Sequence, residues 1–379
     1  MDYAMLPTRT SEPPNAAQPV LRLRGLRTQF QLEDGVVNAV EEVDLEIGRG
    51  ETLAVVGESG CGKSVMARSV LGLVDRPGKI MAGQVWVPAP PPREPGERRL
   101  GFRARREEAR RAKVLPDAPP GMIDLATAEP ELVRGVRGKR IAMVFQEPMT
   151  SLSMMHTIGN QIIEAITLHE NLTKDQARQR AIDLLGRVGI PSPEQRIDAY
   201  PFQLSGGMRQ RAMIAMALSC GPELLIADEP TTALDVTTQA QILELLTSLQ
   251  DEFEMSIMLI THDLGVAAQL ADRVAVMYLG RVVEQGELRR LFAEPRHPYT
   301  QALLRSVPKL GRDRNVRLAP VRGIVPHPYH RPSGCPFHDR CDSFIPGRCD
   351  TAPPPVITTD DGHQVRCVLY QEDSDDGHR

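Results

Sequence analysis

The feature that most constrains this chain is a glycine-rich turn between a strand pattern and a helix pattern. The apolar run TLAVV at residues 52–56 precedes GESGCGKS at residues 57–64, and SVMARSVLGLV continues as an amphipathic helix. The turn matches G-x-x-x-x-G-K-[ST], in which successive backbone N–H groups wrap phosphate oxygens at a helix N-terminus. In these surroundings the pattern predicts a phosphate-binding loop in an α/β protein rather than a chance glycine-rich turn.

Each residue type in this loop has a predicted task. The amine of Lys63 reaches the β and γ phosphates of a nucleotide, and the hydroxyl of Ser64 holds Mg²⁺. The glycines let the backbone approach the phosphates closely. The predicted nucleotide-binding residues of the loop are Gly57, Ser59, Gly60, Cys61, Gly62, Lys63 and Ser64.

A later strand pattern ends in two acidic residues. The run LLIADEP places Asp228 and Glu229 at a strand's carboxyl end. There Asp228 can bind the Mg²⁺ shell, while Glu229 can polarise a water in line with the γ phosphate. Two acids at a strand end are by themselves more often surface charges. Downstream of a phosphate-binding loop, they predict a catalytic pair.

A second predicted phosphate cradle lies in LSGGMRQR at residues 204–211. Ser205, Gly206 and Gly207 precede the amphipathic helix MRQRAMIAMALSC, so they form another helix N-terminus able to hold phosphate. One nucleotide hardly needs two such cradles from one chain. The pattern therefore predicts a head-to-tail pair of chains, in which each chain closes over ATP held by the other.

Length and composition predict a main α/β domain with smaller units. The 379 residues exceed what one hydrophobic core usually serves, and hydrophobic residues make up 41% against 4% aromatics, as suits buried parallel strands. Before the loop, VLRLRGLRTQF and VDLEIGRGETLAVVGESG predict edge strands that lead into a buried central strand. Strand patterns return at residues 223–228, 256–261 and 273–280, separated by helix-length segments, and predict a parallel sheet.

Changes of composition set the predicted boundaries. The pattern becomes helical from residue 141, with Thr173 capping KDQARQRAIDLLGRV. Residues 88–120, which read as an insertion, are rich in Pro, Lys and Arg. A solvated surface segment is favoured there over a contact with a partner or lipid headgroups. We expect a flexible tail at 1–19, an ATPase domain at 20–290 with an insertion at 88–120 and a helical subdomain at 147–205, and a C-terminal extension at 291–379.

Charge and hydropathy narrow the class of protein. The net charge of −4 gives no global reason to bind nucleic acid. No apolar run approaches the roughly 18 to 20 residues of a membrane span, and the N-terminus lacks the pattern of a signal peptide. We therefore expect a cytoplasmic protein. Because disulfides are rare there, its six cysteines are expected to be reduced thiols or metal ligands.

With these motifs, residues 20–290 resemble the nucleotide-binding subunits of ABC transporters. The resemblance implies a P-loop NTPase core of ABC type, a parallel sheet with an antiparallel β-subdomain, and ATP and Mg²⁺ as cofactors. It implies that Gln146 in MVFQEP joins the Mg²⁺ and water site and that His262 in LITHD contacts the γ phosphate. Ser205 to Gln210 match the signature, and Asp235 belongs to the D-loop. Without the resemblance, His262 would be taken as a capping or core residue. Phe30 is the candidate for stacking on adenine.

Longer stretches resemble a narrower branch. GKRIAMVFQEPMTSLSMMHTIGNQI, YPFQLSGGMRQRAMIAMAL, EPRHPYTQALLRSVP and GIVPHPYHRPSGCPFHDRC are similar to the D-type ATP-binding subunit of oligopeptide, dipeptide and nickel importers. The chain departs from this branch at the 88–120 insertion and at SLSMM, where Ser-Leu-Asn-Pro is usual. The resemblance implies catalysis by Glu229, His262 and Gln146, with Mg²⁺ held by Ser64, Gln146 and Asp228.

The branch also implies partners and a location. We expect a second, non-identical ATP-binding subunit, two transmembrane permease subunits and an extracytoplasmic peptide-binding protein, with this chain peripheral on the cytoplasmic face of the inner membrane and no nucleic-acid partner. The alternative is a soluble ABC ATPase that acts on nucleic acid or the ribosome. A single cassette, and the short distance in sequence between Lys63 and Ser205, argue against it.

Four cysteines near the C-terminus form a C-x5-C-x7-C-x17-C pattern: Cys335, Cys341, Cys349 and Cys367. Their surroundings offer little apolar core, and a bound metal would supply a cross-link. Four thiolates suit a [4Fe–4S] cluster or Zn²⁺, and nearby histidines at 327, 330, 338 and 363 could replace one of them. Because C-x2-C pairs are absent and the importer branch has similar cysteines, we expect a structural [4Fe–4S] cluster, with Zn²⁺ as the alternative. An electron carrier that merely binds nucleotide is disfavoured by the complete set of hydrolytic motifs.

Overall fold

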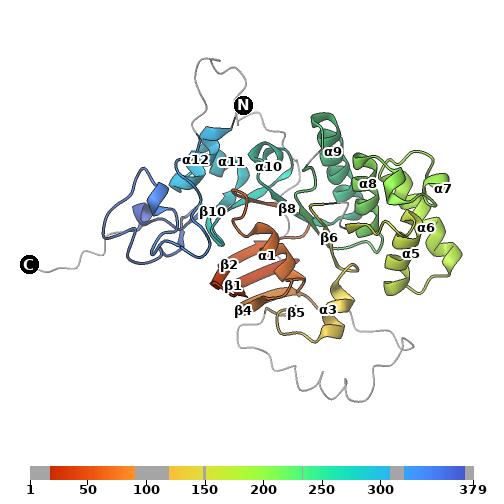
Figure 1. Cartoon of the computed structure of the whole chain (residues 1–379), viewed down its shortest axis with the longest axis horizontal. Coiled ribbons are helices and arrows are strands. Elements are labelled where there is room, and N and C mark those ends of the chain that lie inside the picture. Colours follow the sequence, from red (N-terminus) through yellow and green to blue (C-terminus); the bar gives the residue numbers. More distant parts are fainter. Residues whose placement is uncertain (1–17, 90–118, 148–150, 233, 308–319, 372–379) are drawn as a thin grey trace, which may run out of the picture.

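A computed structural model describes residues 18–89, 119–147, 151–232, 234–307 and 320–371 (Figure 1). Most of the predicted N-terminal tail and of the predicted 88–120 insertion lies outside these residues. Among the residues described, no helix is long and apolar enough to cross a membrane.

The centre of the molecule is a sheet whose strands run in the order β11-β12-β10-β9-β3-β8-β7-β6. Neighbouring strands from β9 to β6 pair in parallel, while β10, β11 and β12 are antiparallel. The parallel strands are β3 (Thr52–Val56), β6 (Ile141–Val144), β7 (Leu224–Asp228), β8 (Ser256–Thr261) and β9 (Arg273–Tyr278). The carboxyl ends of these strands therefore lie at one edge of the sheet, where the loops that follow them can meet.

The parallel strands are continuous apolar runs because both faces of the sheet are covered. Successive residues of β7 and β8 join different hydrophobic clusters: Leu225 and Leu259 pack on one side, and Leu224 and Met258 on the other. Helices α1 (Lys63–Val70), α9 (Val236–Phe253) and α10 (Leu264–Leu270) contribute buried faces to these clusters and to a third one.

A second sheet is entirely antiparallel, in the order β2-β1-β4-β5. Its strands are β1 (Leu21–Leu32), β2 (Gly35–Ile47), β4 (Gly78–Pro88) and β5 (Met122–Asp124). Buried residues alternate along the start of β1, since one face packs against the cluster that also contains Met66 and Val70 of α1.

Helices gather at one side of the molecule, which is green in Figure 1. They are α5 (Ile158–His169), α6 (Lys174–Arg187), α7 (Pro193–Arg196), the 3₁₀ turn η2 (Pro201–Gln203) and α8 (Gly206–Ala217). Helix α3 (Pro130–Val136), yellow in Figure 1, lies apart from them near β5. The predicted cap is confirmed: the Thr173 hydroxyl accepts from the Gln176 N–H, and the Gln176 side chain accepts from the Thr173 N–H. The helical pattern predicted from residue 141 is wrong at its start, because 141–144 form β6 beside β7.

The C-terminal extension packs on the sheet, at the opposite end from these helices (Figure 1). It begins within α11 (Leu288–Ala293), which follows β10 (Arg281–Glu287). It contains α12 (Pro298–Ser306), η3 (His338–Arg340), β11 (Ile357–Thr358), β12 (Gln364–Val365) and η4 (Val368–Tyr370). Because β12 pairs with β10, the extension continues the main sheet. A buried contact supports this pairing: the His363 Nε2 lies 2.8 Å from a Glu284 carboxylate oxygen.

Candidate functional site

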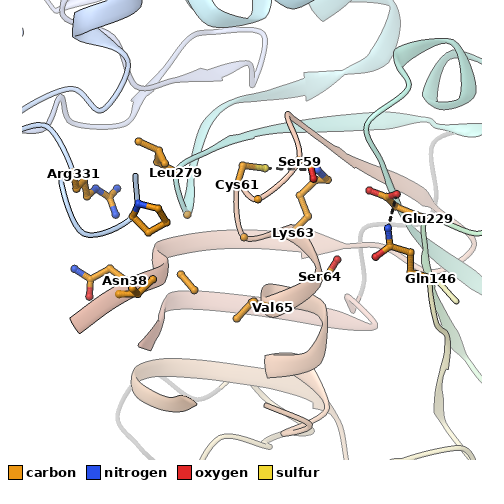
Figure 2. Close-up of a pocket in the computed structure, with 16 residues that line it drawn as sticks. Asn38, Ser59, Cys61, Lys63, Ser64, Val65, Gln146, Glu229, Leu279 and Arg331 are labelled. Carbon is orange, nitrogen blue, oxygen red and sulfur yellow. Dashed lines mark hydrogen bonds between the residues drawn. The ribbon is translucent and has the colours of Figure 1, made fainter. Parts of the chain in front are cut away.

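The phosphate-binding loop forms the floor of a pocket of about 240 Å³. Residues from five parts of the chain meet there: β2, the loop with the start of α1, the segments that follow β6 and β7, the turn between β9 and β10, and the C-terminal extension (Figure 2). The lining residues include Asn38, Ser59, Gly60, Cys61, Gly62, Lys63, Ser64, Gln146, Glu229, Leu279, Pro328 and Arg331.

The glycines of the loop are required by space as well as by backbone conformation. Gly57 and Gly62 have φ values of 155° and 99°, which L side chains rarely adopt. A Cβ on Gly57 would lie 2.2 Å from the Met277 carbonyl oxygen, and one on Gly62 would lie 2.1 Å from that of Ala39. Helix α1 begins directly after Gly62, without a side-chain cap. Its first N–H groups are thus available to an anion.

Lys63 is buried and points back over the loop. Its ammonium group donates to the carbonyl oxygens of Gly57 at 2.7 Å and of Glu58 at 3.0 Å. These carbonyls satisfy hydrogen bonds but carry no net charge. A cation held over helix-terminal N–H groups suits a polyphosphate, so the residues of the loop fit the phosphates of a nucleotide.

Next along the pocket, Ser64 and Asp228 form an oxygen-rich pair. The Ser64 hydroxyl donates to Asp228 Oδ1 at 2.9 Å, and Asp228 is 1% exposed. Burial raises the pKa of Asp228, the neighbouring Glu229 charge adds to this, and the Ser64 hydrogen bond opposes it. A hydroxyl and one carboxylate are the kind of partial oxygen set that holds Mg²⁺ together with phosphate oxygens.

Glu229 and Gln146 line one end of the pocket, and His262 lies beside Glu229. Gln146 donates to Glu229 Oε2 at 2.9 Å, and His262 Nδ1 lies 3.3 Å from Glu229 Oε1. The Thr232 hydroxyl also donates to Oε2 at 2.8 Å. Figure 2 shows Gln146 and Glu229 facing each other beyond Ser64. The structure thus brings together the three residues predicted to be catalytic.

The other predicted nucleotide residues lie elsewhere. Ser205, Gly206, Gly207 and Gln210 are at the start of α8, where the Ser205 hydroxyl accepts from the Met208 N–H at 3.3 Å. Asp235 caps α9 by accepting from the Thr238 N–H at 3.0 Å. None of them lines the pocket. The N-terminus of α8 is therefore separate from the N-terminus of α1 that faces the pocket.

Phe30 is not part of the pocket either. It pairs with Gly78 on β4, where a Cβ built on Gly78 would lie 2.6 Å from the Phe30 ring. The pocket's wall is instead completed by Pro328 and Arg331. Sequence reasoning missed these residues because no motif spacing connects them to a loop more than 260 positions earlier.

The extension also contacts the phosphate-binding loop, through Glu58. The Arg340 guanidinium donates to both carboxylate oxygens of Glu58, at 2.7 and 3.0 Å, and to the Tyr278 hydroxyl at 3.2 Å. The buried Tyr299 hydroxyl accepts from the Glu58 N–H at 2.9 Å. Bidentate pairs of this kind fix geometry as well as adding energy. The shape of the phosphate-binding loop therefore depends on α12 and η3.

The predicted [4Fe–4S] cluster is contradicted. Cys335, Cys341, Cys349 and Cys367 do line one cavity, but its volume is about 10 Å³, which is room for roughly one water molecule. Burial, with the other cysteines adding, raises the pKa of Cys335 to about 12 and of Cys367 to about 11, which favours protonated thiols. Throughout the described part of the chain, no group of three or more His, Cys, Asp or Glu residues is arranged to hold a metal ion. Nothing supports the Zn²⁺ alternative.

Comparison with known proteins agrees with this geometry. The model of the family described as ABC transporter matches residues 40–232, and that of the oligopeptide/dipeptide transporter C-terminal region matches 283–349. The chain is 44% identical to the dipeptide transport ATP-binding protein DppD of Escherichia coli, over 94% of this chain and 98% of that protein. It is 45% identical to the oligopeptide transport ATP-binding protein AppD of Bacillus subtilis, over 93% of this chain and 98% of that one.

Solved structures show the same fold. The ATP-binding cassette MJ0796, in a structure bound to ADP and Pi, superposes with a TM-score of 0.56 at 24% identity, over 71% of this chain and 98% of that one. The α/β fold class with an ABC-type core is thereby confirmed.

This chain belongs to the ABC transporter family. Within the family it is an ATP-binding ATPase of the oligopeptide/dipeptide importer type, as the sequence motifs predict.

Proposed function

We propose that this chain hydrolyses ATP to power the import of peptides through partner permease subunits. The observation that carries the proposal is the meeting of Gln146, Glu229 and His262 at the end of a phosphate-binding pocket, in a chain similar along nearly its whole length to dipeptide and oligopeptide transport proteins. The alternative of an ABC ATPase acting on nucleic acid or the ribosome is not favoured by these relatives.

Within the pocket we assign the triphosphate to Gly57, Ser59, Gly60, Cys61, Gly62, Lys63 and Ser64. Bound ATP would place its charge against the N–H groups of the loop and the Lys63 ammonium. Mg²⁺, when bound, would neutralise phosphate charge beside Ser64, Asp228 and Gln146. Glu229 would orient the attacking water and accept its proton, and the contact with Gln146 holds its carboxylate in place.

His262 has a separate assigned task. Its Nδ1 lies 3.3 Å from a Glu229 carboxylate oxygen, and its side chain is 56% exposed and so accessible to a bound nucleotide. We assign it to contact the γ phosphate. This task needs only a hydrogen bond and no proton transfer by His262.

Ser205, Gly206, Gly207 and Gln210 are assigned to a nucleotide on a second ATP-binding subunit. Their helix N-terminus lies outside this chain's own pocket, and a helix N-terminus attracts phosphate. Asp235, at the start of α9, would lie at the same interface. We propose that this second subunit is non-identical and that the pair works beneath two permease subunits fed by an extracytoplasmic peptide-binding protein, on the cytoplasmic face of the inner membrane.

The test is peptide uptake in vesicles that carry the assembled permeases and both ATP-binding subunits. When ATP is supplied on the side of the membrane where this chain lies, we expect labelled di- or oligopeptide to accumulate on that side. Lys63→Ala should abolish this accumulation. Arg322→Ala is the control, because the Arg322 side chain is 82% exposed, pairs with Asp342 and does not line the pocket. ATP hydrolysis without uptake of any peptide would contradict the proposed cargo.

A further inference from the structure

One end of the nucleotide pocket is built by the C-terminal extension. Figure 2 shows Asn38, Leu279 and Arg331 at the end opposite Gln146 and Glu229, with Lys63 and Ser64 between. Pro328 lines the pocket as well. If the phosphates lie on the loop with the γ phosphate toward Glu229, the nucleoside must lie toward Arg331. This step rests on the placement of the triphosphate under the proposed function.

Among the residues that the structure describes, no aromatic side chain lines the nucleoside end of the pocket. Phe30, the aromatic candidate on β1, packs beside Gly78, and the lining residues at this end are Val37, Asn38, Ala39, Leu279, Gly280, Pro328 and Arg331. A planar base is bound favourably by stacking on a flat group. Among these residues, Arg331 offers the flat and delocalised group, since a guanidinium stacks on aromatic faces.

Arg331 is held in place by an ion-pair relay. Its guanidinium pairs with Glu41 on β2, and the Arg281 Nη2 of β10 lies 3.0 Å from the same carboxylate group. The Arg331 side chain is 19% exposed, and its Nη2 is buried without a hydrogen-bond partner. A guanidinium anchored at one edge presents a fixed plane, which lowers the ordering cost of stacking.

The segment that carries Arg331 is also anchored. The half-buried Tyr329 ring lies against the β1–β2 turn, where a Cβ on Gly35 would be 3.6 Å from it. The His327 ring stacks on Tyr329, with centroids 5.1 Å apart and planes 22° apart. Residues 327–331 are therefore fastened to the hairpin that forms the other side of the pocket.

We propose that residues 327–331 of the extension form the base-binding wall of this chain's own ATP site, with the Arg331 guanidinium stacked on the adenine and Pro328 packed beside it. This wall takes the place of an aromatic residue on β1. Arg331 is a binding residue, not a catalytic one.

The experiment measures the affinity of the full chain for ATP and for inorganic tripolyphosphate, which has the phosphates but no base. Arg331→Ala is expected to weaken ATP binding about tenfold and to leave tripolyphosphate binding unchanged. At saturating ATP, the hydrolysis rate of the assembled transporter should stay within about twofold while KM rises. Arg322→Ala is the matched control, because it removes an exposed arginine of the same extension.

Two further variants separate stacking from charge and from misfolding. Arg331→Lys keeps a cation that can pair with Glu41, so it should fold, yet it lacks the plane and should still lose ATP affinity. Arg331→Tyr removes the cation but supplies a ring, so it should recover most of the loss. Equal weakening of ATP and tripolyphosphate, or unchanged ATP affinity in both Arg331→Ala and Arg331→Lys, would overturn the proposal. If the Arg331 variants lose ATP affinity selectively but the unsubstituted transporter takes up no peptide, only the proposed cargo is refuted.

Discussion

At the scale of single residues, Glu229 is held by several side-chain contacts and has an unusual backbone conformation. It accepts from Gln146 and Thr232 and lies near His262, while its backbone has φ of 46°, an unusual value for a residue with a side chain. Such backbone conformations persist where neighbouring contacts determine them, and they cluster at functional sites. These contacts agree with the task proposed for Glu229, the activation of a water beside the γ phosphate.

Glu229→Gln should slow ATP hydrolysis by about 10² to 10⁴-fold while ATP binding is preserved. Glutamine keeps the shape of the side chain and still accepts from Gln146, but it cannot take the proton from water. The measurement is steady-state hydrolysis in the assembled transporter, with the partner's own site inactivated so that it does not mask the loss. An unchanged rate under those conditions would remove Glu229 from its assigned task.

Some residues of the site can be predicted from short sequence motifs, and others cannot. Lys63, Ser64, Asp228 and Glu229 stand in short motifs whose spacing carries the chemistry, so the sequence predicts them and the structure brings them together. Arg331 carries no such local signal. Its place in the pocket depends on Glu41, about 290 positions away, and an ion pair over that distance leaves no periodic trace.

At the scale of elements, the cap of a helix could be predicted from the sequence, whereas a short strand could not. The cap of α6 is a local pattern, Thr173 with Gln176 three residues later, and the sequence is sufficient to predict it. Strand β6 has four residues, and what makes it a strand is its pairing with β7, such as Ile141 beside Leu224. A window of the sequence around 141–144 does not contain that partner, which is why the helical prediction failed there.

Thr173→Ala should lower the free energy of unfolding by about 1 kcal/mol, because it leaves an N–H at the start of α6 without its acceptor. Thr173→Ser keeps the hydroxyl and serves as the matched control. Amide hydrogen exchange in the first turn of α6 should accelerate in the alanine variant alone. Similar exchange in both variants would mean that the cap contributes little in this surrounding.

At the scale of the whole molecule, the extension is attached through a buried polar cluster. The His297 ring accepts from the Tyr299 N–H at 3.1 Å at the start of α12, while both carboxylate oxygens of Glu284 accept backbone N–H groups from Arg296 and His297. Burial lowers the pKa of His297 from 6.5 to about 4, although the Glu284 charge opposes the shift. The folded protein thus holds this ring neutral.

Stability should therefore fall on acidification. Between pH 6.5 and about 4 the unfolded chain binds a proton at His297 that the folded chain does not, so the free energy of unfolding decreases as the pH drops through this window. The full effect is on the order of 3 kcal/mol. Denaturation midpoints measured from pH 7.5 to 4.5 should decline less steeply in His297→Asn, which can still accept from the Tyr299 N–H. Parallel curves for the two proteins would show that His297 does not report the docking of the extension.

The pairing of two subunits gives a second prediction at this scale. Ser205→Arg should impair hydrolysis of ATP held by the partner subunit, because a bulky cation would stand at the helix N-terminus assigned to that nucleotide. ATP affinity at Lys63 of the same chain should change less than twofold, since α8 does not line that pocket. Loss of binding at the chain's own loop, with normal turnover by the partner, would argue against the head-to-tail arrangement.

The pair formed by Glu58 and Arg340 has a consequence for descent and for engineering. The two residues are 282 positions apart and fall within separate family matches, yet the Glu58 carboxylate and the buried Arg340 guanidinium share two hydrogen bonds. Loss of Glu58 alone would leave the buried Arg340 guanidinium without its carboxylate, so relatives should keep the two residues together or replace them together. A chimera that joins the first 290 residues of one importer subunit to the tail of another should remain competent only when both halves carry matching members of this pair.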